Sequence, residues 1–246
     1  MSDPIQAPGL PEAVTAAAAE LAAGGHHLLT AGTLSALAGA GAEDWARFAR
    51  HWDDLTADTY MRDGGTYRYR RYGHFHLDSA TDALTALPHA PYAQDLTVNP
   101  LNGGVQRHFD PLTEAFLADP LTRATVLTLG RIFSAAEGVT AWDVKLHPFR
   151  IVTGAGETGK PAPQGRHRDG STFVTSLLVA RHNVTGGESS LYTDDGEQLC
   201  AVTLSTPGEQ LLVDDRRVLH DVTPVLPVDP ARPAYRDVLI VDFDLL

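Results

Sequence analysis

Residues 172–180 read TFVTSLLVA, a run of β-branched and apolar side chains with the length of one buried strand. Six similar runs lie at residues 144–152, 190–193, 199–204, 210–213, 217–223 and 238–243. Turn signals rich in glycine, aspartate and proline separate these runs from one another. Seven short strands in succession favour a sandwich, a jelly roll or a barrel over a parallel α/β sheet.

The part of the chain before residue 141 has a different character. It contains four segments of helix-forming residues, so we predict helices at residues 11–23, 33–37, 43–52 and 120–137. The stretches 62–78 and 99–110 are rich in glycine or arginine and are predicted to be loops that could line a site. We expect one domain over residues 1–246, with helical support and substrate loops in about 1–140 and the β core in about 141–246.

The composition argues against several classes of partner. The 246 residues contain 19 Lys and Arg and 31 Asp and Glu, which gives a formal net charge of −12 and disfavours binding to nucleic acid or anionic membranes. The single cysteine, Cys200, excludes internal disulfides and cysteine-based metal clusters. No apolar run approaches the roughly 18 residues of a membrane span, and the first residues lack the basic start of a targeting signal. We therefore expect a cytoplasmic protein without a membrane partner, whose oligomeric state stays open.

The motif GRHRDG at residues 165–170 is the best candidate for chemistry. In an extended segment His167 and Asp169 project to the same face, which suits two ligands of one metal. His220, about fifty residues later in another predicted strand, is the best candidate for a third ligand. Two imidazoles and one carboxylate suit Fe(II), with open positions for a cosubstrate and O₂. The alternative is a chance His-x-Asp pair on a surface loop and a core histidine at position 220.

Arg236 opens the last predicted strand, sixteen residues after His220. Arg236, Val238 and Ile240 share one face of that strand, so we expect the guanidinium to lie among apolar neighbours. A buried arginine needs an anion, and its planar fork matches a carboxylate. A dicarboxylate that chelates a metal at one end and contacts Arg236 at the other would meet that need.

These elements together resemble the Fe(II)/2-oxoglutarate dioxygenases of the double-stranded β-helix fold. The chain looks most like a bacterial branch that hydroxylates free amino acids and includes an L-isoleucine hydroxylase, and the similarity spans roughly residues 45–246. The stretches that carry it are residues 58–65, 67–71, 99–104, 146–151, 167–170, 183–189, 212–224 and 236–243. The resemblance implies a mainly β jelly roll with N-terminal helices. It also implies that His167, Asp169 and His220 bind iron and that Arg236 anchors 2-oxoglutarate.

The function implied by this resemblance is hydroxylation of an unactivated C–H bond of a free L-amino acid or a close derivative, with Fe(II), 2-oxoglutarate and O₂. Two alternatives stay open: desaturation or another oxidation of a different small metabolite at the same site, and a non-catalytic β-barrel that binds a metal or a small ligand. Asp169 favours hydroxylation over halogenation, because resembling halogenases carry a small residue at that position. The sequence does not specify the amino acid or the carbon that is oxidised.

Further polar residues are candidates for substrate binding. Arg68, Arg70 and Arg71 could bind a substrate carboxylate, with a surface cation–π cluster as the alternative. Asp63 or Asp215 could accept its ammonium group.

Two more pairs have both a functional and a structural interpretation. Asp215 and Arg217 belong to a charged run that leads into His220, where they could orient a ligand, touch the substrate or simply be solvated. His147 and Arg150 lie on opposite faces of the predicted strand 144–152, and either could face the pocket or serve structural pairing.

Overall fold

A computed structural model of the chain describes residues 12–99, 101 and 103–246. Residues 1–11, for which the sequence predicts no targeting signal, lie outside the described residues, as do residues 100 and 102 of the predicted loop 99–110. The helices are α1 (Glu12–Gly24), α2 (Ala31–Ala38), α3 (Ala42–Ala49), the 3-10 helix η1 (Arg50–Asp54), α4 (Glu114–Ala118) and α5 (Pro120–Glu137). Within the described part of the chain, no helix is long and apolar enough to cross a membrane.

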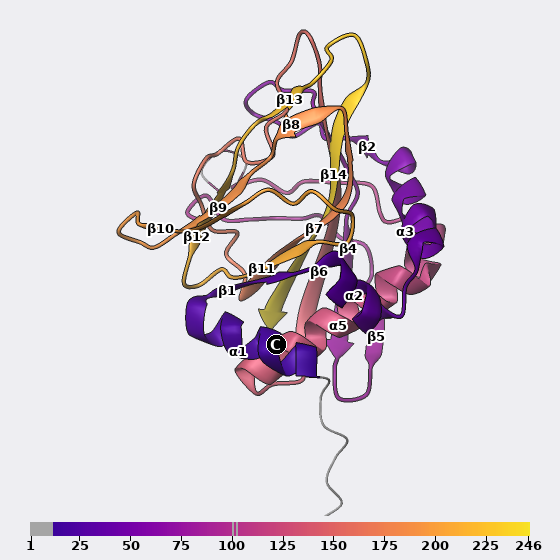
Figure 1. The fold of residues 1–246 in the computed structure, drawn as a ribbon, viewed down its shortest axis with the longest axis vertical. Coiled ribbons are helices and arrows are strands. Elements are labelled where there is room, and N and C mark those ends of the chain that lie inside the picture. Colours follow the sequence, from indigo (N-terminus) through magenta and orange to yellow (C-terminus); the bar gives the residue numbers. More distant parts are fainter. Residues whose placement is uncertain (1–11, 100, 102) are drawn as a thin grey trace, which may run out of the picture.

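Nine of the described strands form one large antiparallel sheet (Figure 1). They are β1 (His26–Leu29), β2 (Thr56–Ala57), β3 (Arg68–Arg70), β4 (Gly73–Asp78), β5 (Ala83–Ala86), β6 (Ala141–Thr153), β7 (Phe173–His182), β11 (Gln210–Asp214) and β14 (Ala234–Leu245). The order along the sheet is β1-β11-β7-β14-β6-β3-β2, with β4 paired to β6 and β5 paired to β4. Strand β14 is central, since it pairs with β6 on one side and β7 on the other.

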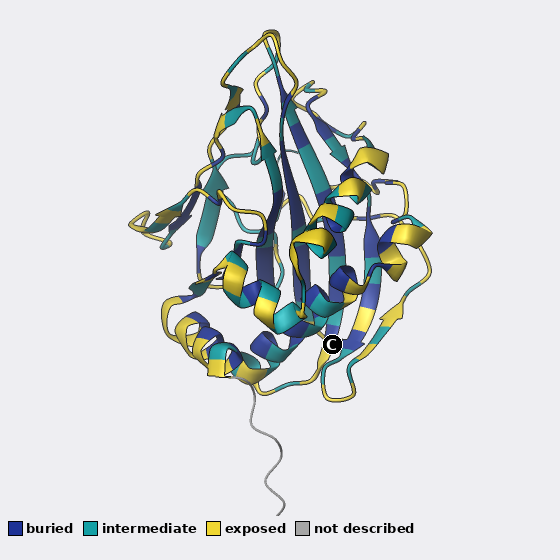
Figure 2. Ribbon diagram, turned by 45° about the vertical axis from the view of Figure 1, so that its right-hand side comes forward, coloured by how far each residue is buried: buried dark blue, intermediate teal, exposed yellow. Residues whose placement is uncertain are grey.

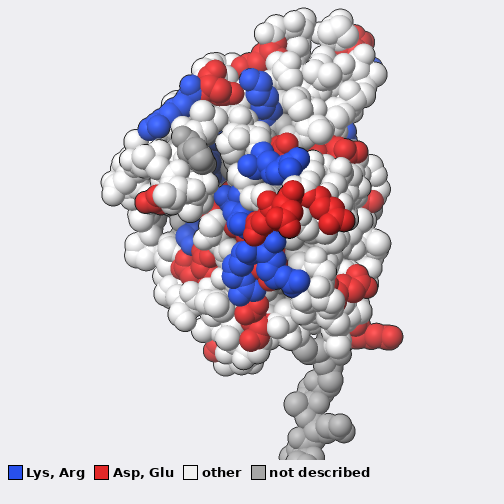
Figure 3. Space-filling model, turned by 90° about the vertical axis from the view of Figure 1, so that its left-hand side faces the viewer, with Lys and Arg blue, Asp and Glu red and all other residues white. Residues whose placement is uncertain are grey.

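Shorter strands face this sheet and close the jelly roll (Figure 1). Strands β9 (Ser189–Tyr192), β10 (Gln198–Val202) and β12 (Leu219–Val222) form one small sheet, and β8 (Val184–Gly186) pairs with β13 (Val225–Pro227). The face that carries β9, β10 and β12 bears lysine and arginine side chains interleaved with acidic ones (Figure 3). This face therefore differs from the single-sign basic patch that is typical of nucleic-acid binding.

The two faces of β14 contact different parts of the protein. Leu239, Val241 and Phe243 point into the main core, where α5 packs, and the residues between them point into the jelly roll. Phe133 of α5 stacks on Phe173 of β7 at 4.3 Å between ring centroids and meets Phe243 edge-on at 4.8 Å. The helices bury one face against this core and expose the other (Figure 2). The core thus fixes β14, and with it the inward side chains of β14.

Local sequence explains the ends of α5. Asp119 caps the N-terminus by accepting the backbone N–H of Leu121 at 2.9 Å, and Pro120 occupies the first turn, where no intrahelical partner is needed. Gly138 ends the helix in the left-handed region with φ of +77°. The predicted boundaries 120–137 agree with this helix.

The predicted fold class is confirmed: a mainly β jelly roll, that is a double-stranded β-helix, with helices from the N-terminal part. One local prediction is wrong, because the stretch 62–78 is not a loop throughout. It contains β3 and β4, which pair with β6 at the side of the large sheet. Strand β3 reads Arg-Tyr-Arg and lacks the alternating apolar residues that mark a strand, whereas Phe75 and Leu77 of β4 alternate with polar residues and were a signal for a strand. The division of the chain into a supporting part and a core within one domain stays a prediction.

Candidate active site

The three predicted metal-binding side chains lie together at one end of β12. His167 and His220 exchange backbone hydrogen bonds of 2.9 and 2.8 Å, an isolated antiparallel bridge that joins the His-x-Asp segment to β12. Asp169 places one carboxylate oxygen 3.6 Å from Nε2 of His167 and the other 3.3 Å from Nε2 of His220. One donor atom from each residue lies within 4.8 Å of the others. Two imidazole nitrogens and one carboxylate oxygen form the donor set of mononuclear non-haem Fe(II) sites, so the residues present fit such an ion.

The charges within this trio are strongly coupled. Burial alone would raise the pKa of Asp169, but the side chains of His167 and His220 outweigh burial and hold this pKa well below its usual range. Burial lowers the pKa of His220, whereas Asp169 and Asp215 raise it, with a net pKa of about 10. A metal ion bound to these residues would displace a proton from an imidazole, because histidine binds metals in its neutral form.

Asp215 links the two segments that carry the trio. Its carboxylate is 1% exposed and accepts the backbone N–H groups of Asp169 at 3.1 Å, Gly170 at 2.7 Å and Ser171 at 3.2 Å. The same carboxylate lies 3.5 Å from Nδ1 of His220. Asp215 therefore supports the three predicted metal ligands from outside the cavity, and it is not placed to contact a substrate.

Arg236 projects from β14 into the jelly roll and is 1% exposed. Its Nε and Nη2 atoms have no hydrogen-bond partner among the residues that the structure describes. Burial, with a smaller effect of Arg181, lowers the pKa of Arg236 to about 10. Gly187 makes room for this side chain, because a Cβ there would lie 3.0 Å from Cδ of Arg236, and its φ of +70° also favours glycine. A buried guanidinium with two free N–H groups fits a carboxylate.

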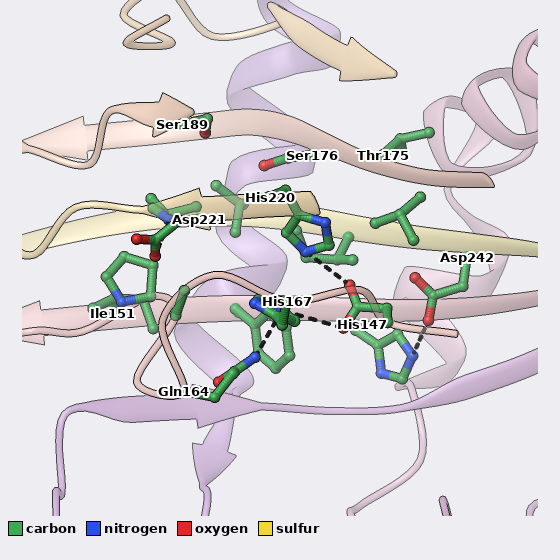
Figure 4. A pocket seen from close by; sticks show the side chains of 18 of the residues that line it. His147, Ile151, Gln164, His167, Thr175, Ser176, Ser189, His220, Asp221 and Asp242 are labelled. Atoms are coloured by element: carbon green, nitrogen blue, oxygen red, sulfur yellow. Dashed lines mark hydrogen bonds and ion pairs between the residues drawn. The ribbon is translucent and has the colours of Figure 1, made fainter. Parts of the chain in front are cut away.

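One cavity between the large sheet and the smaller strands is lined by both the trio and Arg236. Figure 4 shows His167 and His220 in this cavity. Thr175, Ser176, Val238 and Ile240 line it from the large sheet, and Ser189 and Asp221 line it from the opposite side. The cavity thus offers a set of metal-ligand side chains and an anion site within one enclosure.

The far wall of the cavity is built from β3 and the stretch before α4. Arg68 of β3 donates to Asp58 with contacts of 2.7 and 2.8 Å, and both side chains are buried. Arg70 lies between two rings, with its guanidinium carbon 3.7 Å from the centroid of Phe109 and 4.4 Å from that of Phe149. Arg68 and Arg70 both line the cavity, as two residues of the same face of a strand should.

His147 and Asp242 face the same cavity and contact each other. Nε2 of His147 lies 3.1 Å from a carboxylate oxygen of Asp242 (Figure 4). Nδ1 of His147 lies 2.5 Å from Nη2 of Arg70. Burial lowers the pKa of His147 well below its usual value, so its ring is neutral. The second carboxylate oxygen of Asp242, Oδ1, has no partner within the described residues.

The structure keeps four other candidates away from the cavity. Arg71 follows Arg70 and therefore points to the opposite side, where it donates to the carbonyl groups of Asp54 and Pro111. Asp63 lies in an exposed turn and accepts from Tyr67 and Gly65.

The other two are engaged elsewhere. Arg150 faces outward from β6 and pairs with Asp237 at 2.8 Å. Arg217 donates to the carbonyl groups of Ala22 and Ala23 near the end of α1. The predictions that these four residues contact the substrate, and that Asp215 does so, are therefore not supported by the structure.

Some lining residues were missed by the sequence analysis. Asp242 could have been found, since it follows Arg236, Val238 and Ile240 on the same face of β14. Arg107 lies in the stretch 99–110, which was expected to line a site without any single residue being chosen. Tyr92, Gln94, Asn99 and Gln164 also line the cavity, and they come from segments without a periodic pattern.

Comparison with known proteins agrees with this geometry. The profile of the 2OG-Fe dioxygenase family matches residues 49–242. A solved bsmA homolog from Methylobium petroleophilum PM1 is 36% identical, with a TM-score of 0.87 over 96% of this chain and 94% of that one. The Fe(II)/α-ketoglutarate-dependent dioxygenase TqaL shares the fold, with 19% identity and a TM-score of 0.72 over 95% of this chain and 90% of that one.

One curated relative is an enzyme of known reaction. The 3(1)-hydroxy-L-isoleucine 4-dioxygenase of Pantoea ananatis is 26% identical over 157 residues, which is 62% of this chain. The match spans 63% of the length of that relative, which is less than two thirds.

Proposed function

Because the chain belongs to the 2OG-Fe dioxygenase family, whose members use Fe(II), 2-oxoglutarate and O₂, we propose that it hydroxylates an unactivated C–H bond of a free L-amino acid or a close derivative. In this proposal His167, Asp169 and His220 bind Fe(II), and Arg236 binds the distal carboxylate of 2-oxoglutarate. The observation that carries it is that one cavity contains the three donor side chains and the buried Arg236, whose Nε and Nη2 have no hydrogen-bond partner among the described residues. Asp169 supports hydroxylation over halogenation, since its carboxylate occupies the position of a metal ligand.

The side chains of this chain have separate tasks in the reaction. Bound Fe(II), together with 2-oxoglutarate and O₂, would supply the oxidising chemistry, which releases succinate and CO₂. Asp215 holds the two ligand-bearing segments in register through its backbone hydrogen bonds. Arg236 neutralises a carboxylate that would otherwise be buried without a partner, and the apolar side chains of Val238 and Ile240 exclude water beside it.

An amino acid needs a cation for its carboxylate and an acceptor for its ammonium group. The arginines of the far wall meet the first need. Asp242, whose Oδ1 has no partner in the part of the chain that the structure describes, replaces Asp63 and Asp215 as the acceptor. The name of the Pantoea ananatis relative, which includes an amino acid substrate, supports the same class.

Blocking either end of the amino acid should slow the reaction. We expect esters and N-acyl derivatives of the best substrate to lose about 30-fold or more in kcat/KM, because each unpaired buried charge costs about 2 kcal/mol. The test is 2-oxoglutarate consumption and succinate release across the free amino acids and their blocked forms, with mass detection of the hydroxylated product. If only a peptide, a carrier-bound residue or a metabolite other than an amino acid stimulates 2-oxoglutarate consumption, the proposed substrate class is wrong. The assignment of the iron ligands would not be affected by that result.

Asp215 should act on the metal through His220 and through the backbone of the His-x-Asp segment. We expect Asp215→Asn to weaken metal binding by about 10–100-fold, the usual effect of removing a carboxylate that supports a ligand. Titration of the protein with Mn(II) measures this without turnover. Asp214→Asn is the matched control, since Asp214 directly precedes Asp215 at the end of β11 and pairs with Arg216 instead. Equal Mn(II) affinity of Asp215→Asn and the wild type would show that Asp215 only stabilises the turn.

A further inference from the structure

Three buried arginines meet at the far wall of the cavity, and their partners differ. Arg68, Arg70 and Arg107 are 7%, 3% and 2% exposed. Arg68 is paired with the buried carboxylate of Asp58 by two short contacts. Among the described residues Arg107 has no carboxylate within ion-pair distance, and Arg70 reaches one only at 3.9 Å, between its Nη1 and Asp58. One wall thus holds a structural ion pair and two guanidinium groups without a close counter-ion.

The two guanidinium groups without a close counter-ion, those of Arg70 and Arg107, contact the same aromatic rings. The guanidinium carbon of Arg107 lies 4.8 Å from the centroid of Tyr92 and 5.7 Å from that of Phe109, and Arg70 stacks on Phe109 as well. The Nε atoms of both arginines are buried without a hydrogen-bond partner in the described part of the chain. Mutual repulsion accompanies this arrangement, since burial, with the charges of Arg68 and Arg107, lowers the pKa of Arg70 to about 9. Two like charges held together in a buried pocket are unfavourable unless an anion joins them.

The position of Arg107 is also tied to the metal-ligand segment. Nη2 of Arg107 donates to the side-chain oxygen of Gln94 at 2.7 Å, and the amide nitrogen of Gln94 donates to the backbone carbonyl of Asp169 at 3.2 Å. These hydrogen bonds fix the position of Arg107 relative to Asp169, so an anion bound to Arg107 would also lie at a fixed distance from Asp169. Oxidation of one particular carbon requires that the substrate be held in such a fixed position.

We propose that Arg70 and Arg107 together bind the carboxylate of the substrate, and that this pair makes the enzyme selective for the free acid. The inference rests on the proposed function and adds to it, since Arg107 was not among the candidates from the sequence. Arg236 has a separate role in the other part of the cavity, and Arg68 is a structural residue.

The test compares an amino acid with its primary amide, which has nearly the same size but no negative charge. Succinate release is measured for the twenty free L-amino acids and their amides with the wild type and Arg107→Met. The wild type should prefer the acid by about 30-fold or more, and Arg107→Met should reduce this ratio to within about 3-fold, while KM for 2-oxoglutarate stays unchanged. An unchanged ratio in Arg107→Met would overturn the inference. If no amino acid stimulates the wild type, the proposed function fails and the inference fails with it.

Thermal unfolding gives a readout that does not depend on turnover. Removal of an unpaired buried charge should leave Tm of Arg107→Met equal to or above that of the wild type. The matched control is Arg68→Met, which removes the two short contacts of Asp58 and leaves Arg70, at 3.9 Å, as its nearest cation; it should lower Tm by roughly 10 °C. A comparable loss of Tm in Arg107→Met would show that Arg107 is a structural residue and would overturn its assignment to the substrate.

Discussion

Replacing His167, Asp169 or His220 by alanine is expected to abolish turnover, with a loss of about 1,000-fold or more in succinate release. Each of these residues supplies one of three donor atoms that lie within 4.8 Å of one another. Substitutions of groups that only support a ligand already cost about 10–100-fold, so loss of a ligand itself should cost more. The measurement is succinate release with Fe(II), 2-oxoglutarate and the best amino acid substrate, together with Mn(II) titration of each variant.

The fold should survive these three substitutions. The bridge between His167 and His220 consists of backbone hydrogen bonds, which do not depend on either imidazole. Circular dichroism and thermal unfolding should therefore resemble those of the wild type. His76→Ala is a suitable control, since its half-exposed imidazole on β4 lies 3.6 Å from Asp143 and outside the cavity, and it should retain activity. Near-normal turnover in any one of the three variants would show that this residue is not a ligand.

The sequence was most informative where function and strand pattern coincide. His167 and Asp169 are two residues apart, which predicted that they share one face of an extended segment. The family resemblance supported His220 as the third ligand, and the structure shows that its strand is bridged to the segment of His167. Alternation also predicted that Arg236 points inward, because it shares a face with the apolar residues Val238 and Ile240, and all three line the cavity. The two inferences from alternation require only the local geometry of extended chain.

The substrate side of the site depends on register and on distant segments, which a single sequence does not reveal. Arg68, Arg70 and Arg71 look equivalent in a predicted loop, but pairing of β3 with β6 turns the first two inward and the third outward. Arg107 reaches the cavity only because its aromatic neighbours pack against β3, a contact between segments far apart in the chain. Asp215 belongs to a charged run that is usually solvated, and only the fold places it against the backbone of Asp169.

Replacing Arg236 by alanine or lysine is expected to raise the apparent KM for 2-oxoglutarate by about 30-fold or more. Loss of a charge-assisted pair in a buried site costs roughly 2–4 kcal/mol. Lysine should rescue poorly, since its ammonium group cannot present two parallel N–H groups to one carboxylate. The KM for the amino acid should change little, because Arg70 and Arg107 occupy a different part of the wall. Steady-state kinetics with each substrate varied in turn separates the two effects.

Arg150→Lys is the matched control for Arg236. Arg150 lies on β6 opposite Asp237 of β14, but it faces outward and is already paired with that carboxylate at 2.8 Å. Its substitution should therefore leave the KM for 2-oxoglutarate unchanged. An unchanged KM in the Arg236 variants would move the anchor to another basic group inside the jelly roll. Arg181 would then be the next residue to test. It lies on β7 directly opposite Arg236 of β14, and its Nη1 is buried without a partner in the described residues.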